Sequence, residues 1–178
     1  MVKSKFSLLF VVFISIAITS CSDDDSVQNT VLNVSDIEGN WSLFQINSTP
    51  VVDLEGDANT NPNIMAQTDC FNGMSLNFGT NGVLTVVSSE ITFDSNADPS
   101  FDCSLRTDVG SYSISGNDLT VTIPISGNQE IQTVVIDVQN NNILSFTLTE
   151  SQVAQFFSVP SGESFSTITE LEFVYEKF

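Results

Sequence analysis

Residues 74–86 read MSLNFGTNGVLTV, and this stretch predicts two antiparallel strands joined by a tight turn. Leu76 and Phe78 alternate with polar residues, which is the pattern of a strand with one buried face. Asn81-Gly82 tolerates positive φ angles and therefore favours a hairpin between the two strands. The chain thus contains at least one β-hairpin with an apolar face.

The same alternation continues on both sides of this hairpin. Connections between the strands are short and carry turn residues, with no helix-length crossover, so the sheet is expected to be antiparallel. A meander of about eight strands that hides its edges closes into an up-and-down barrel, and a two-sheet sandwich is the alternative. Two segments interrupt the meander: a long polar loop at 50–69 and a segment at 151–165 with one helical turn. The other predicted strands contain GNWSLFQI, GSYSIS, LTVTIPI, QTVVIDV, ILSFTLTE and TELEFVYEKF.

The N-terminal segment, residues 1–20, has the organisation of a secretory signal peptide. Lys3 and Lys5 precede an apolar core that is too short to span a membrane comfortably. The string ITSC at 18–21 resembles the bacterial lipobox, which implies that the thiol of Cys21 is acylated and that the chain is cleaved just before it. A plain secretory signal and an uncleaved anchor are the alternatives.

Residues 21–36 are expected to form a lipidated acidic tether, and residues 37–178 a β-barrel domain. The tether lacks periodic apolar residues and would reach roughly 20 Å. Its run of three Asp residues resembles the export signal of surface-displayed lipoproteins of Bacteroidota, while a solvated linker is the simpler interpretation. The expected location is the outer membrane, on its periplasmic or cell-surface face.

Lipidation of Cys21 would leave an even pair of cysteines, Cys70 and Cys103. Outside the cytoplasm these two would meet an oxidising environment, so we expect them to form a disulfide. Two separate buried thiols are the alternative.

The charge of the chain restricts its partners. Removal of Lys3 and Lys5 with the signal peptide leaves two basic against 22 acidic residues, a net charge of −20. Such a surface repels nucleic acid and anionic headgroups, because it lacks the basic patch that both require. We therefore expect no nucleic-acid partner.

The residue types also argue against an enzyme. The chain contains no histidine, which removes the commonest general base, and its cysteines are accounted for by acylation and disulfide formation. A carboxylate pair of the glycosidase type is the remaining option, but no two acidic residues stand out at inward positions. We predict a protein without catalytic activity or cofactor.

Calcium is the one metal that the acidic loops could suit. Asp94, Asn96 and Asp98 match the start of an EF-hand loop, but Pro99 stands where the glycine should be and no glutamate closes the loop. A second acidic run at 53–59 also lacks a closing ligand. Solvated loops, and no metal site, are therefore expected.

The order of motifs resembles a known family. Gly39-Asn40-Trp41 resembles the G-x-W motif of lipocalins, and the succession of Trp41, Cys70, LNFGTNGVL, Cys103, GSYSISGNDLTV and LSFTLTE resembles the lipocalin-like domains of Bacteroidota lipoproteins. The resemblance covers about residues 37–178 and implies that Trp41 packs across a closed end of the barrel. Lipocalins usually back this tryptophan with an arginine, whereas the last strand here offers only Lys177.

The resemblance implies a barrel that binds a small apolar or amphipathic molecule. The alternation places Phe78, Tyr112, Phe146 and Phe173 as candidate cavity-lining residues, although they can equally fill a packed core. The pair Phe156-Phe157 could cap a cavity. The alternative function is a ligand-free, surface-displayed interaction or assembly module of an envelope complex.

Overall fold

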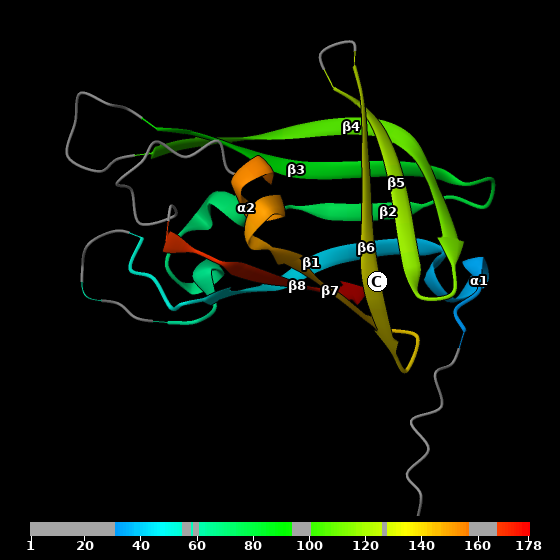
Figure 1. The fold of residues 1–178 in the computed structure, drawn as a ribbon, viewed down its shortest axis with the longest axis horizontal. Coiled ribbons are helices and arrows are strands. Elements are labelled where there is room, and N and C mark those ends of the chain that lie inside the picture. The colour runs from blue at the N-terminus through cyan, green and yellow to red at the C-terminus, as the bar shows by residue number, and fades with distance from the viewer. Residues whose placement is uncertain (1–30, 55–57, 59–60, 94–100, 126–127, 157–166) are drawn as a thin grey trace, which may run out of the picture. The chain divides into compact units, whose positions relative to one another are not determined.

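The computed structural model describes residues 31–178 except 55–57, 59–60, 94–100, 126–127 and 157–166. Its eight strands form one closed barrel in which each strand pairs with its sequence neighbours and β8 pairs with β1, all antiparallel (Figure 1). The predicted up-and-down barrel is therefore confirmed. The strands are β1 (Gly39–Thr49), β2 (Ser75–Phe78), β3 (Val83–Phe93), β4 (Phe101–Ser115), β5 (Asp118–Ile125), β6 (Asn128–Gln139), β7 (Ile143–Thr149) and β8 (Glu170–Lys177).

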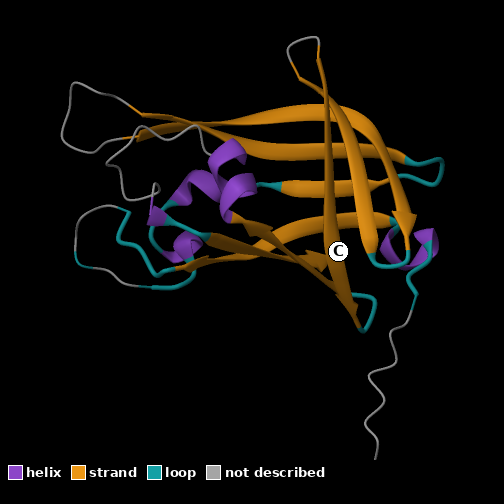
Figure 2. Ribbon diagram, viewed as in Figure 1, coloured by secondary structure: helices purple, strands orange, loops and turns teal. Residues whose placement is uncertain are grey.

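Short helices occupy the two ends of the barrel. Figure 2 shows α1 (Val34–Ile37) at one end and η1 (Ile64–Ala66), η2 (Asp69–Phe71) and α2 (Glu150–Phe156) towards the other. We call these the α1 end and the α2 end. The three hairpins β2–β3, β4–β5 and β6–β7 turn at the α1 end. No helix in the described part of the chain is long and apolar enough to cross a membrane.

The β2–β3 hairpin forms as the alternation predicts. Leu76 and Phe78 are buried, and Phe78 pairs with Leu84 across the two strands. The turn spans residues 79–82, and Gly82 alone adopts the left-handed conformation, with φ at 72°. Burial of the alternating apolar face fixes the register, because a slip by one residue would turn that face to solvent.

Gly110 on β4 lies close against the backbone of β5. A Cβ atom there would overlap the backbone of Thr122 on β5, so no larger residue fits. The β4–β5 pairing ends at Ser111, next to Gly110, and from there to Phe101 strand β4 pairs only with β3 among the described strands. The β5–β6 hairpin therefore diverges from the β3–β4 hairpin towards the α2 end (Figure 1).

The segment between β1 and β2 was predicted as a polar loop, and this prediction is wrong in part. Its apolar residues Val52, Leu54 and Ile64 belong to the core. The amide of buried Gln67 holds it together: Oε1 accepts from the Leu54 N–H, and Nε2 donates to the carbonyls of Val52 and Asn61. Its polar residues satisfy backbone groups of the loop itself, which is why composition alone suggested an exposed segment.

Helix α1 was not predicted. The backbone N–H of Asn33 donates to the Asp36 carboxylate at 2.7 Å, which stabilises the first turn. Ile37 is fully buried and packs in the core. One apolar residue in a four-residue helix leaves no periodic signal that sequence inspection could detect.

Candidate ligand site

The α1 end of the barrel is closed by Trp41. This side chain is fully buried, and its Nε1–H donates to the carbonyl oxygen of Ile37 in α1 at 2.7 Å. Lys177 Nζ lies over the indole ring, 5.0 Å from its centroid, in cation–π geometry. Lys177 thus takes the position beside the tryptophan that the lipocalin resemblance assigned to an arginine.

Towards the α2 end, strands β6 and β7 separate, so the barrel wall is open between them. These strands pair only over Ile136–Gln139 and Ile143–Phe146. Beyond the Ile136–Phe146 pair, β6 continues with β5 as far as Asn128, whereas β7 continues with β8 as far as Thr149. Figure 1 shows β6 and β7 diverging from their shared turn. We call this opening the β6–β7 fork.

A cavity of about 560 Å³ occupies the fork. Its volume lies within the range typical of small-molecule sites. Val134, Ile136 and Phe146 supply apolar surface, and polar side chains surround them. The described residues that line it are Asn117, Thr133, Val134, Val135, Ile136, Asp137, Ser145, Phe146, Thr147, Thr149 and Gln152.

Phe146 is backed by two further aromatic rings. It stacks on Phe173 with the ring centroids 5.2 Å apart and on Tyr175 with the centroids 6.0 Å apart. Tyr175 is buried, and this burial raises the pKa of its hydroxyl well above the ordinary value, so the group is neutral. The cavity therefore has a rigid aromatic side supported from the core.

The other two candidate lining residues form a separate pair. The Phe78 and Tyr112 rings meet edge to face, with centroids 4.9 Å apart, and neither lines the fork cavity. Tyr112 Oη donates to the carbonyl of Gly79 in the β2–β3 turn. Burial, and secondarily the charge of Glu38, raises the pKa of Tyr112. Phe146 is thus the candidate that contacts the cavity, with Phe173 behind it.

The polar lining was not predicted from the sequence. Asn117, Thr133, Asp137 and Gln152 lie on a turn, on the outer positions of β6 and on α2, where polar residues are ordinary. They line one cavity together with Val134, Ile136 and Phe146, beside the point where the β6–β7 pairing ends. Thr149, which ends β7, is tied to Gln152 through its N–H and its hydroxyl.

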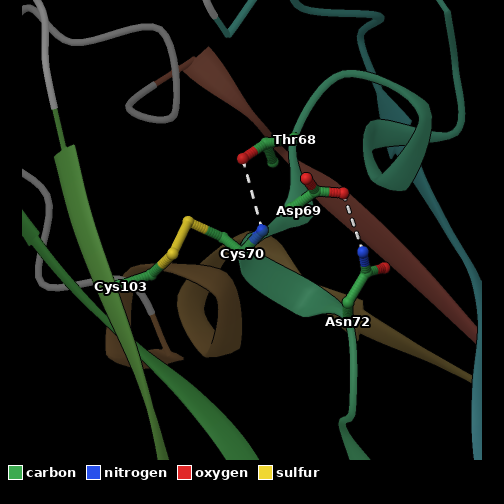
Figure 3. Close-up of a disulfide and its surroundings, with 5 residues drawn as sticks. All are labelled: Thr68, Asp69, Cys70, Asn72 and Cys103. Atoms are coloured by element: carbon green, nitrogen blue, oxygen red, sulfur yellow. Dashed lines mark hydrogen bonds between the residues drawn. A yellow bond between two sulfur atoms is a disulfide. The ribbon is translucent and has the colours of Figure 1, made fainter.

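The predicted disulfide is present. Cys70 on η2 and Cys103 on β4 are bonded, with their Cα atoms 5.5 Å apart and 33 residues apart in sequence (Figure 3). Thr68 Oγ1 accepts from the Cys70 N–H, and Asn72 donates to Asp69, so side-chain bonds hold both ends of η2. The disulfide therefore joins the β1–β2 connection to the extended part of β4.

The remaining predicted sites fall largely outside the described residues. These include the lipidation site Cys21, the calcium candidates Asp94, Asn96 and Asp98, and the residue Phe157. Of the second acidic run, Asp53 is described, and its carboxylate accepts from the Ala58 N–H. Within the described residues no group of three acidic, cysteine or histidine side chains could hold a metal ion.

The cavity lining, in the part of the chain that the structure describes, contains no basic side chain. Arg106 pairs with Asp108 on β4, the one salt bridge among the described residues, with Nε to Oδ2 at 2.7 Å. Lys177 lies over Trp41 at the α1 end. Of the described residues that line the cavity, only Asp137 is charged.

The chain forms a closed eight-stranded meander, with a buried tryptophan at the α1 end and a cavity in the half towards the α2 end. These are the features of the lipocalin class of barrels. A family model described as a lipocalin-like domain matches residues 37–146, more than half of the chain. The protein therefore belongs to the lipocalin-like domain family. This fold typically binds small molecules rather than catalysing reactions.

Comparison with solved structures finds a lipocalin-like protein from Bacteroides uniformis. It is 15% identical, covers 80% of this chain and 99% of its own, and has a TM-score of 0.39. No curated protein matches the chain.

Proposed function

We propose that this protein is an extracytoplasmic lipoprotein, anchored in the outer membrane through acylated Cys21, whose barrel binds a small apolar or amphipathic molecule in the β6–β7 fork. It acts as a binding protein and not as an enzyme, with no nucleic-acid partner. The observation that supports ligand binding most directly is the cavity of about 560 Å³ with Phe146 on one side.

The composition of the cavity supports an amphipathic ligand. Phe146, Val134 and Ile136 would contact an apolar part, and the hydroxyls of Thr133 and Thr147 would contact a polar part. Ligand sites typically combine apolar surface with a few polar groups that orient the bound molecule.

The position of the chain's entry into the barrel fits the anchoring proposal. The described chain starts at Val31 and leads through α1 into β1, so a tether attached there leaves from the α1 end. The fork cavity belongs to the half of the barrel towards the α2 end.

Native mass spectrometry of the protein extracted from its own membrane tests both parts of this proposal. We expect acyl chains on Cys21 and a retained small molecule. A Thr147→Trp variant fills the cavity and should lose this molecule, whereas Thr107→Trp, at an exposed position on β4 away from the cavity, should keep it. Equal retention by both variants would refute binding in the fork, and an unmodified Cys21 would refute the anchor.

A second candidate function, the interaction module, is favoured by the free edge of β6. From Asn128 to Val135 this strand pairs with β5 but with no described strand on its other side. Ile131 and Val135 are each 66% exposed along this edge. Unpaired edges can accept an extended segment of another chain.

An Ile131→Lys variant distinguishes this second function. A charge on the β6 edge should abolish association with an envelope partner, while Val109→Lys on the outer face of β4 should not. If the native protein purifies without a stable partner, this result would count against the interaction module.

A further inference from the structure

The charge of the fork cavity determines which headgroups it can accept. Asp137 lines the cavity, and one of its carboxylate oxygens accepts from Gln139 Nε2 at 2.8 Å. Among the described residues no basic side chain lines the cavity: Arg106 is paired with Asp108, and Lys177 lies over Trp41. A bound anion would therefore meet a negative charge without a compensating cation.

We propose that the cavity selects neutral and cationic amphiphiles and rejects anionic ones. This inference rests on the proposed function, since it names the ligand class of the same site. The whole chain carries a net charge of −18, so its general field also repels anions and attracts cations.

The polar groups of the lining suit uncharged hydroxyl-bearing or amide-bearing headgroups. Gln152 Oε1 accepts from both the N–H and the hydroxyl of Thr149, which orients the Gln152 side chain and leaves its Nε2–H group as a donor. The Thr133 hydroxyl shares a hydrogen bond with Thr120 and retains further bonding capacity. These groups are neutral, so none of them supplies a positive charge that would offset the Asp137 carboxylate for a bound anion.

The size of the cavity brings any headgroup close to Asp137. A volume of about 560 Å³ corresponds to a space roughly 10 Å across, which is similar to the Debye length at physiological salt. The Asp137 charge is therefore only partly screened at the headgroup. High salt should weaken the discrimination.

Three amphiphiles with the same decyl chain and different headgroups test the proposal: decyl maltoside, decyltrimethylammonium and decanoate. Each is titrated as a monomer into the full-length Cys21→Ser chain at low ionic strength, with heat of binding and methyl shifts of Val134 and Ile136 as readouts. We expect the maltoside and the ammonium compound to bind and to shift these methyls. Decanoate should bind about tenfold more weakly or worse.

Asp137→Asn should weaken binding of the ammonium compound about two- to fivefold and leave the maltoside unchanged. Asp102→Asn removes the same charge from an exposed position on β4 and is the matched control. An equal effect of both substitutions would overturn the role of Asp137, since net charge alone would then explain it.

The remaining outcomes separate this inference from the proposed function. If decanoate binds as tightly as the maltoside, with the same methyl shifts, the charge selectivity is wrong while ligand binding stands. If none of the three compounds binds, the proposed function fails and the selectivity fails with it.

Discussion

Lys177 on the last strand holds its ammonium group 5.0 Å from the ring centre of Trp41 on the first strand. The two strands pair directly, with Trp41 opposite Lys177, so this contact lies where the barrel closes. Backbone bonds from Lys177 to Asn142 and from Phe178 to Asn40 reinforce the same end.

Replacing Lys177 tests this contact. Lys177→Met keeps the aliphatic stem but removes the charge, and we expect it to lower the free energy of unfolding by about 0.5 to 2 kcal/mol. Lys177→Arg should retain most of the stability because it retains the cation. Chemical denaturation measures both variants, and a fully stable methionine variant would show that the stem alone matters.

The disulfide should contribute substantially to stability. Its 33-residue separation predicts a loss of about 3 to 4 kcal/mol when Cys70 and Cys103 are both replaced by serine. Denaturant unfolding of the double variant, compared with the oxidised wild type, measures this difference. Unfolding midpoints that agree within error would contradict the prediction.

Gly110 should tolerate no side chain. A Cβ atom would overlap the carbonyl oxygen of Thr122, so Gly110→Ala must displace β5 from β4. We expect a destabilisation of about 1 to 3 kcal/mol. Ser111→Ala at the neighbouring exposed position is the control and should be nearly neutral; comparable losses in the two variants would show that the close approach of Gly110 to Thr122 is not the cause.

Stability should fall at alkaline pH because of Tyr175. Burial raises the pKa of its hydroxyl in the folded state above the ordinary value of 10.0, so the unfolded chain ionises first as the pH rises. The contribution of neutral Tyr175 to the free energy of unfolding is complete below pH 10. It is lost above that pH, and the free energy of unfolding then falls by up to about 1.4 kcal/mol per pH unit. Tyr175→Phe should flatten the unfolding free energy measured across pH 9 to 11.5, and an unchanged slope would argue that Tyr175 ionises freely in the barrel.

Much of the fold could be predicted from the sequence because burial imposes a period of two. Leu76 and Phe78 alternate with polar neighbours and are buried, and Leu144 and Phe173, at inward positions of their own strands, are buried as well. The disulfide could be predicted because Cys70 and Cys103 remain as a pair if Cys21 is the acylated cysteine. These features depend on local pattern or on simple counting.

The fork cavity could not be predicted in this way. It depends on where the β6–β7 ladder stops, and nothing in the residues around Ile136 and Phe146 signals that end. The β1–β2 connection was misjudged for a related reason: Gln67 satisfies three backbone groups inside the loop, a role that its polar character conceals. Sites formed by long-range geometry leave little local trace in a sequence.

The central claim is that the fork cavity binds an apolar or amphipathic molecule against Phe146. Titration of the full-length Cys21→Ser chain with the neutral dye Nile red measures this most directly, with Phe146→Ala compared against Phe44→Ala. Phe44 is 56% exposed on the outer face of β1, so it controls for the loss of an aromatic ring. We predict saturable binding that Phe146→Ala weakens about tenfold and Phe44→Ala leaves unchanged. Binding that is unaffected by Phe146→Ala, or lost equally in both variants, would contradict the account.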